Sequence, residues 1–506
     1  MLARVATFAV EGVEGREVTV EVDVRRGLPA FSLVGLPDAS VREARERVRA
    51  ALLNSDLDFP QQRLTANLAP AAVRKAGPAF DLAIAVGLLA ASGQVPADSL
   101  EGTAVCGELS LGGELRAVRG MLAAALGAHA RGYRRMIVPE ANAGEAALAS
   151  GVEVLGAGLL AQIVDLLHGR WLPEPARPRR GAATALRDVP DLADVRGQVD
   201  AKRALEIAAA GGHNLLMVGP PGAGKTMVAR RLPGILPPPS FEEALEITRI
   251  HSVAGVGGGA LATERPFRAP HHTISPQGLV GGGSRPKPGE MTLAHRGVLF
   301  LDELAEYSRA ALEALRQPLE DGVVEIVRGQ RALTFPTRAV LIAACNPCPC
   351  GEPNGECTCR EIDRDRYQRR LSGPLLDRID LLCRVSTPAA AELVVPGRSG
   401  GETSAAIAAR VVAARERQRA RLAGSGALCN GEMDGRLTRR QVVLGGRAVE
   451  RLLGSAGAGV LTGRGHDRVL RLARTIADLA GRDRVIDEDV DEALGYRLAT
   501  PGAAAA

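Results

Sequence analysis

Lysine is nearly absent from this chain of 506 residues. Only four of its 63 basic residues are lysines, and these are Lys75, Lys202, Lys225 and Lys287. Arginine can replace lysine wherever only a positive charge is needed, but its planar guanidinium cannot replace a compact ammonium group between nucleotide phosphates. The lysine retained at position 225 lies in a glycine-rich motif, which indicates a phosphate-binding role.

Aromatic residues and long apolar runs are also scarce. Aromatics make up 3% of the chain, which argues against platforms on which bases stack. The longest apolar run, Leu82–Ala91, is too short to cross a bilayer. The first residues carry charges and lack the apolar core of a signal peptide. We therefore expect a cytoplasmic protein without a membrane partner. Its net charge of +5 is mild, so any contact with DNA would be made locally, by arginines with phosphates.

Two motifs predict a nucleotide site. The segment GPPGAGKT follows the apolar strand Leu215–Val218 and has the pattern G-x-x-x-x-G-K-T, whose backbone N–H groups surround phosphate oxygens. The segment VLFLDE is a second apolar strand that ends in two carboxylates. Together they predict that the protein binds and hydrolyses a nucleoside triphosphate. The binding residues expected are Gly219, Pro220, Pro221, Gly222, Ala223, Gly224, Lys225, Thr226 and Asp302.

Composition divides the chain into parts. Strand and helix patterns alternate over the first ~170 residues; EVTVEVDV (17–24) has the period of a strand and VREARERVRAALL (41–53) that of a helix. A proline-rich stretch at 172–190 predicts a linker. We expect a first α+β domain at 1–171, the linker at 172–190, an α/β nucleotide-binding domain at 191–390, a helical domain at 391–500, and a tail at 501–506.

Several segments carry a family resemblance: VRGQVDAKRALEIAAAGGHNLLMVGPPGAGKT, FRAPHHTIS, GEMTLAHRGVLFLDE, ACNPCPCG and GPLLDRIDL. They resemble the AAA+ ATPases of the magnesium-chelatase-like branch, and most closely the competence-associated ComM/YifB family. The resemblance implies a P-loop AAA+ core, a helical lid of the magnesium-chelatase C-terminal type, and a hexameric ring that uses ATP and Mg²⁺.

The resemblance also implies roles for single residues. Lys225 would neutralise β- and γ-phosphate charge, Thr226 and Asp302 would hold Mg²⁺, and Glu303 would polarise the attacking water. Asn346, at the end of the strand AVLIAAC, would sense the γ-phosphate. Arg378 in GPLLDRID would be the arginine finger offered to a neighbouring subunit, and Arg464 in LTGRGHDR a second sensing arginine. For a single arginine, the alternative is a surface ion pair.

Basic residues flank the VLFLDE strand in two candidate hairpins. Arg265, Arg268, Arg285 and Lys287 precede it, and Arg328 and Arg331 follow it. A cationic hairpin tip coupled to a nucleotide site can pull a polyanion without reading its bases. The DNA-contact candidates are therefore Arg285, Lys287, Arg328 and Arg331; an inert exposed turn is the alternative. We read the adjacent pair His271 and His272 as structural rather than metal-binding. The arginine-rich helix 405–422 is read as a solvated face, with DNA contact as the alternative.

Cysteines are concentrated in one short segment. Cys348, Cys350, Cys357 and Cys359 form the spacing C-x-C-x₆-C-x-C, which could place four thiolates around one structural Zn²⁺. A cytosolic location disfavours disulfides. Free thiols and a redox-sensitive cluster remain as alternatives.

The N-terminal region resembles the proteolytic domain of the Lon family, an S5-like fold, through GPAFDLAIAVGLL and GELSLGGELRAVRGMLAAALGAHARGYRRMIVPEAN. Proteolysis would need a serine at position 79 and a lysine in the helix after Gly120. The chain has Ala79, and the segment Met121–Ala125 has no lysine. Without the hydroxyl no acyl intermediate can form, so we expect a catalytically inactive scaffold.

These patterns lead to one functional prediction and two alternatives. The prediction is an ATP-driven hexameric DNA motor of the helicase or branch-migration type, acting in recombination during natural transformation, as the resemblance implies. Its partners would be its own copies, single-stranded or branched DNA, and recombination proteins. The alternatives are a chelatase-type motor subunit acting on a protein or metal partner and, less favoured, an ATP-dependent protease.

Overall fold

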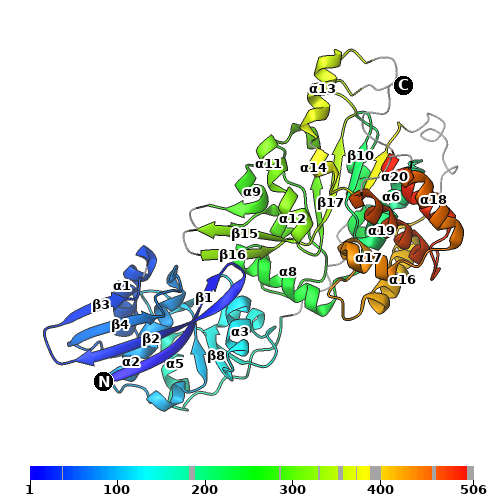
Figure 1. The fold of residues 1–506 in the computed structure, drawn as a ribbon. Helices are drawn as coiled ribbons and strands as arrows, with labels where there is room; N and C mark the ends of the chain where they lie inside the picture. Colours follow the sequence, from blue (N-terminus) through cyan, green and yellow to red (C-terminus); the bar gives the residue numbers. More distant parts are fainter. Residues whose placement is uncertain are drawn as a thin grey trace. The chain divides into compact units, whose positions relative to one another are not determined.

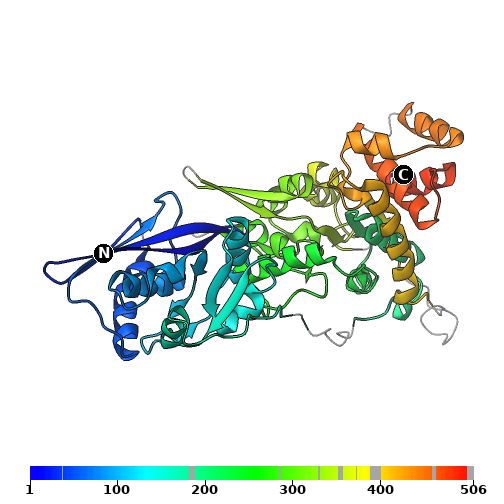
Figure 2. The ribbon, with the colours of Figure 1, turned by 90° about the horizontal axis from the view of Figure 1, so that it is seen from below.

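The chain folds into two units in a computed structural model (Figures 1 and 2). Unit 1 comprises Met1–Ala183, Ser240–Thr263 and Val327–Phe335, and unit 2 comprises Thr184–Pro239, Glu264–Ile326 and Pro336–Ala506. The predicted boundaries assign 240–263 and 327–335 to the nucleotide-binding domain instead. The residues described are 1–36, 38–179, 181, 189–283, 286–328, 331–351, 357–371, 373–387, 401–457 and 463–498.

Unit 1 is built on a seven-stranded mixed sheet with the order β3-β4-β2-β1-β5-β8-β9. Its strands are β1 (Leu2–Glu11), β2 (Glu14–Arg25), β3 (Ala30–Val34), β4 (Arg63–Ala69), β5 (Thr103–Val105), β8 (Arg135–Pro139) and β9 (Glu153–Ala157). Its main helices are α1 (Ala39–Asn54), α2 (Asp81–Ala91), α3 (Met121–Ala130), α4 (Glu140–Ala146), α5 (Leu160–Leu167) and α8 (Phe241–Ala254).

A close approach of helix and strand fixes the core of unit 1. Strand β2 alternates, and its valines at 18, 20 and 22 are fully buried. Helix α2 is buried along its whole length. Gly87 of α2 lies so near β2 that a Cβ there would be 2.6 Å from Val22 Cγ2. Only glycine lets the helix lie this close to the sheet.

Unit 2 contains a five-stranded sheet with the order β11-β14-β17-β10-β18, in which every paired strand is parallel. The strands are β11 (Phe267–Arg268), β14 (Val298–Leu301), β17 (Val340–Cys345), β10 (Leu215–Val218) and β18 (Leu381–Arg384). Their carboxyl ends meet at one edge, where ligands bind in open parallel sheets. The prediction of an α/β core is confirmed, and the structure adds that its sheet is parallel.

The two faces of this sheet explain the continuous apolar runs that predicted the strands. Leu215 and Met217 of β10 lie in one hydrophobic core, whereas Leu216 and Val218 lie in another. Since both faces are covered, every residue of β10 must be apolar.

Helices after the sheet complete unit 2. They are α16 (Ser404–Leu422), α17 (Gly435–Gln441), α18 (Gly446–Gly457), α19 (Gly463–Leu479) and α20 (Asp487–Leu498). Helices α16 and α19 pack on α6 (Val199–Gly211). Arg410 of α16 pairs with Glu206 of α6 at 2.6 Å, and Arg415 donates to the carbonyl oxygen of Ala209 at 2.9 Å. These two arginines of α16 serve packing within unit 2, where we had expected a solvated face.

The candidate DNA-contact residues lie at two short hairpins. Strands β12 (Gly281–Gly282) and β13 (Lys287–Pro288) pair antiparallel, and β15 (Val323–Arg328) pairs with β16 (Arg331–Pro336). Lys287 is exposed. Arg285 lies outside the described residues. Arg328 and Arg331 stand at strand ends, and their side chains lie outside the description.

The first part of the predicted linker at 172–190 forms backbone hydrogen bonds with the rest of unit 1. Backbone N–H groups of Ala176 and Arg179 donate to the carbonyl oxygens of Val154 and Gly144. Residues 182–188 and the tail 501–506 lie outside the described residues. Among the helices that the structure describes, none has the length and apolar content needed to cross a bilayer.

Candidate active site

The glycine-rich loop joins β10 to α7 (Lys225–Ala229). A Cβ at Gly219 would lie 2.1 Å from the carbonyl oxygen of Val385, so the position accepts only glycine. Gly222 and Gly224 have φ angles of +76° and +89°, in the left-handed region that favours glycine. The backbone geometry therefore requires glycine at these three motif positions. The loop leads into helix α7 as a phosphate-binding loop does.

Lys225 is held inside this loop. Its ammonium group donates to the carbonyl oxygens of Gly219 at 2.6 Å and Pro220 at 2.9 Å, and to Oδ1 of Asn346 at 3.1 Å. Burial lowers the pKa of Lys225, and nearby acidic groups, Asp302 and Glu303 among them, oppose that shift. The structure thus brings the predicted sensor Asn346 directly to the predicted phosphate-binding lysine.

Thr226 and Asp302 are in direct contact. The Thr226 hydroxyl donates to Oδ2 of Asp302 at 2.7 Å, and Oδ1 of Asp302 accepts the backbone N–H of Glu303 at 3.0 Å. A hydroxyl and a carboxylate side by side fit the oxygen ligands that Mg²⁺ takes next to nucleotide phosphates. The predicted metal ligands therefore lie together at the carboxyl edge of the sheet.

Glu303 has a partner that sequence reasoning missed. Nδ1 of His272 lies 3.1 Å from Oε2 of Glu303, whose backbone is left-handed with φ +51°. The His272 ring lies 4.1 Å from that of His271 and edge-on to Tyr307 at 6.4 Å. The contact arises because β11, which precedes His272, pairs with β14, which ends two residues before Glu303. No local pattern in the sequence signals this pairing.

His272 is expected to position Glu303 rather than bind ATP. Replacing His272 with alanine should lower kcat by about tenfold, which corresponds to one hydrogen bond, with little change in KM for ATP. His271→Ala is the matched control, because it removes the neighbouring imidazole, which packs against His272 but hydrogen bonds with Thr273 rather than with Glu303. Steady-state ATP hydrolysis measures both constants. A rise in KM without loss of kcat would contradict the positioning role.

Arg378 and Arg464 meet at a second place. Arg378 donates through Nε to the carbonyl oxygen of Arg316 at 2.8 Å and forms an ion pair with Glu320. Arg464 lies 3.6 Å from the same carboxylate, with two thirds of its side chain exposed. Glu320 belongs to α12 (Arg316–Asp321). One acidic residue therefore joins the two arginines predicted to act on the nucleotide.

Arg265 and Arg268, two of the basic residues that precede β14, form hydrogen bonds within unit 2. Arg268 holds Glu290 through two hydrogen bonds of 2.6 and 2.8 Å. Arg265 donates to the carbonyl oxygens of Pro237 and Arg296 at 2.7 and 2.6 Å. Their charges are used within unit 2, which leaves Lys287 as the exposed cation among the described side chains of this region.

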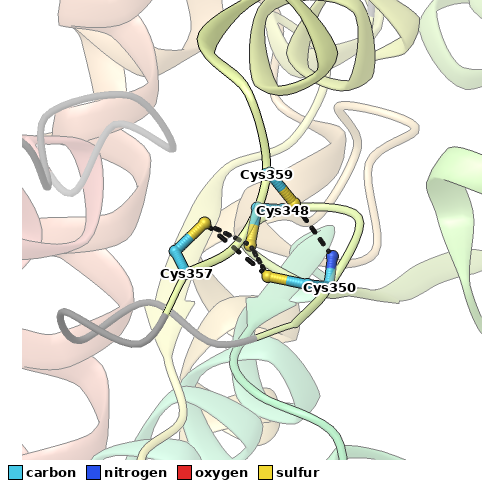
Figure 3. A group of neighbouring side chains, drawn as sticks. All are labelled: Cys348, Cys350, Cys357 and Cys359. Atoms are coloured by element: carbon cyan, nitrogen blue, oxygen red, sulfur yellow. Dashed lines mark hydrogen bonds between the residues drawn. The ribbon is translucent and has the colours of Figure 1, made fainter.

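The four predicted metal-ligating cysteines lie together, and we call them the four-thiol cluster (Figure 3). Their sulfur atoms all lie within 4.8 Å of one another. All four are free thiols, and the backbone N–H of Cys350 donates to Sγ of Cys359 at 3.3 Å. Among the described residues this is the one group of cysteine, histidine and acidic residues arranged to hold a metal, and His271 and His272 are not part of it.

In unit 1 the positions that a Lon-like protease would use carry no nucleophile. Ala79 lies in a short helical turn, and its carbonyl oxygen is 3.8 Å from Sγ of the buried Cys106. Lys75 is fully buried, and its ammonium donates to the carbonyl oxygen of Pro70. Burial raises the pKa of Cys106 to about 11, so this thiol is not an activated nucleophile.

Comparison with known proteins agrees with this geometry. Residues 191–393 match the family described as magnesium chelatase, subunit ChlI; residues 20–142 match subunit ChlI of Mg-chelatase, and residues 401–497 match its C-terminal family. The chain is 43% identical over 504 residues to competence protein ComM of Haemophilus influenzae, covering 98% of this chain and 97% of that one. It is 43% identical over 501 residues to YifB of Escherichia coli, with the same coverage. Lon protease 2 of Bacillus subtilis is 31% identical over 138 residues, 25% of each chain.

Proposed function

This chain belongs to the ComM/YifB family of magnesium-chelatase-like AAA+ proteins, and from that premise we propose that it is an ATP-driven hexameric motor that moves on DNA. Its reaction would be ATP hydrolysis coupled to branch migration in recombination, with natural transformation as the setting. The competence name of the Haemophilus relative supports this setting. The observation that carries the proposal is the joined arrangement of Lys225, Asn346, Thr226, Asp302 and Glu303 at one edge of the sheet.

The residues of the loop suit a bound triphosphate. Lys225 now donates to two loop carbonyls and to Asn346, and phosphate oxygens would replace these acceptors. Mg²⁺, held by Thr226 and Asp302, would neutralise charge on the phosphates. Glu303 adjoins Asp302 and can orient a water toward the γ-phosphate, while His272 fixes its carboxylate. Asn346 follows β17 and accepts a hydrogen bond from Lys225. Its position can therefore change with the presence of the γ-phosphate and transmit that change to β17.

A ring follows from the proposed finger. Arg378 would complete the site of a neighbouring copy, and Glu320 would hold it until the copies assemble. Lys287, Arg328 and Arg331 would then contact phosphates of DNA in the channel. The Lon-like region would be a scaffold without protease activity, because position 79 is alanine. We place the motor in the cytoplasm.

Stimulation of ATP hydrolysis by DNA tests this function. We expect single-stranded or branched DNA to raise the rate of the wild-type protein. The variant Arg328→Ala/Arg331→Ala should lose this stimulation but keep its DNA-free rate. Its DNA affinity should also depend less on salt, with the slope of log K against log[salt] smaller by about 2 for two lost phosphate contacts.

The exposed Arg447→Ala variant on α18 is a control for the loss of one positive charge outside the hairpins, and the single variants Arg328→Ala and Arg331→Ala are its matched counterparts. A chelatase-type motor would hydrolyse ATP without stimulation by any DNA and would not retain DNA at moderate salt. That result would replace the DNA motor with the second candidate function. Casein hydrolysis that disappears in Lys225→Ala would instead favour the protease.

A further inference from the structure

The four-thiol cluster brings its sulfur atoms within 4.8 Å of one another (Figure 3). Cys348 Sγ lies 3.4 Å from Cys350 Sγ and 3.7 Å from Cys357 Sγ, and the last two are 3.6 Å apart. In a tetrahedral site with metal–sulfur bonds of about 2.3 Å, neighbouring sulfurs are about 3.8 Å apart. A disulfide would need about 2.05 Å. The observed spacings therefore fit sulfurs gathered around a single ion.

The donor set selects the metal. Four thiolates in a tetrahedron favour zinc over the hard cations Mg²⁺ and Ca²⁺, which take oxygen ligands. With four protein ligands no position is left for water, so the site is structural rather than catalytic. The N–H of Cys350 donates to Cys359 Sγ, which is the kind of outer-shell bond that orients a metal-bound thiolate.

The cluster is built against the nucleotide site. Cys348 comes two residues after Asn346 and is buried. Gly351 has φ +85°, and a Cβ there would lie 2.4 Å from Cδ of Pro221 in the glycine-rich loop. The segment that carries the first two thiols thus packs directly on the loop that surrounds Lys225.

The other two thiols lead into α13 (Glu361–Arg370), which begins two residues after Cys359. Tyr367 of α13 lies in the same hydrophobic core as Cys345, and its phenol oxygen accepts a hydrogen bond from the backbone of Asn346. One ion at the cluster would therefore connect the glycine-rich loop, the segment after Asn346 and the start of α13.

We infer that the four-thiol cluster binds one zinc ion, and that this ion holds Pro221 of the glycine-rich loop and Asn346 in the positions that nucleotide binding requires. The zinc site stands on the thiol geometry alone. Its effect on nucleotide binding rests on the function proposed above. The two parts are measured separately.

Metal analysis tests the zinc site. The full chain, purified without chelators, should contain about one zinc per chain, and Cys350→Ala/Cys357→Ala should contain less than about a tenth of that. Cys383→Ala removes a buried thiol outside the cluster and should keep its zinc. Cys357→His should also keep it, because imidazole is a zinc ligand, and this variant covers the case in which the double variant fails to fold. Absence of zinc from the wild type, or equal zinc in the double variant, would overturn the site.

Binding of a fluorescent ATP analogue tests the connection. The zinc-free double variant should bind it at least about tenfold more weakly than Cys383→Ala does, a shift of about 1.4 kcal/mol. Equal affinity in the two variants would overturn the connection while the zinc site stands. If wild-type protein with full zinc binds no nucleotide, the proposed function fails instead.

Discussion

Replacing Glu303 with glutamine is expected to lower the rate of ATP hydrolysis by about 10²–10⁴-fold while ATP affinity changes little. Glutamine keeps the size and the hydrogen-bonding reach of the side chain but cannot accept a proton from water. Glu303 adjoins Asp302, and its side chain is largely exposed at the carboxyl edge of the sheet, where a γ-phosphate and an attacking water would meet. Single-turnover hydrolysis and binding of a fluorescent ATP analogue separate the two quantities.

Glu306→Gln is the matched control for Glu303→Gln. Glu306 lies three residues further along and pairs with Arg370 at 3.3 Å, so the same chemical change is made beside the site. We expect it to hydrolyse ATP at close to the wild-type rate. Lys225→Ala is the complementary variant and should lose ATP binding itself. Hydrolysis by Glu303→Gln at a wild-type rate would remove Glu303 from the mechanism.

The elements of the nucleotide site could be predicted because their signals are local. Strands covered on both faces must be apolar throughout, so β10 and β14 stand out as short apolar runs. Position 219 must be glycine because a Cβ there would clash with the backbone of Val385. The glycine is visible in the sequence motif even though the contact is not. The parallel order of the sheet then brings the ends of these strands together.

The partners of the site residues could not be predicted, because they depend on pairing between distant segments. The pair His272 and Glu303 needs β11 beside β14, which no local pattern specifies. Glu320 joins Arg378 to Arg464 across three separate segments. Arg265 and Arg268 look like free cations in the sequence, but their carbonyl and carboxylate partners come from folding.

The last prediction concerns Arg378. Arg378→Ala should lower ATP hydrolysis by about 10³–10⁵-fold if the arginine acts as a finger on a neighbour's γ-phosphate. ATP binding should persist, because Lys225 and Thr226 are untouched. Arg464→Ala removes the other arginine that reaches Glu320 and should have a smaller effect. Thermal unfolding of both variants shows whether loss of the Glu320 contact destabilises the fold instead.

Mixing variants distinguishes action on a neighbour from action within one chain. Arg378→Ala keeps an intact loop but offers no finger, whereas Lys225→Ala offers a finger but has no working loop. In a head-to-tail ring formed from equal amounts of both, about a quarter of the interfaces would join an intact loop to an intact finger. We therefore expect hydrolysis to reappear on mixing two nearly inactive proteins. If the mixture stays inactive although mixed rings are shown to form, Arg378 acts within its own chain, and the site formed by Lys225, Asp302 and Glu303 does not require a neighbour's arginine.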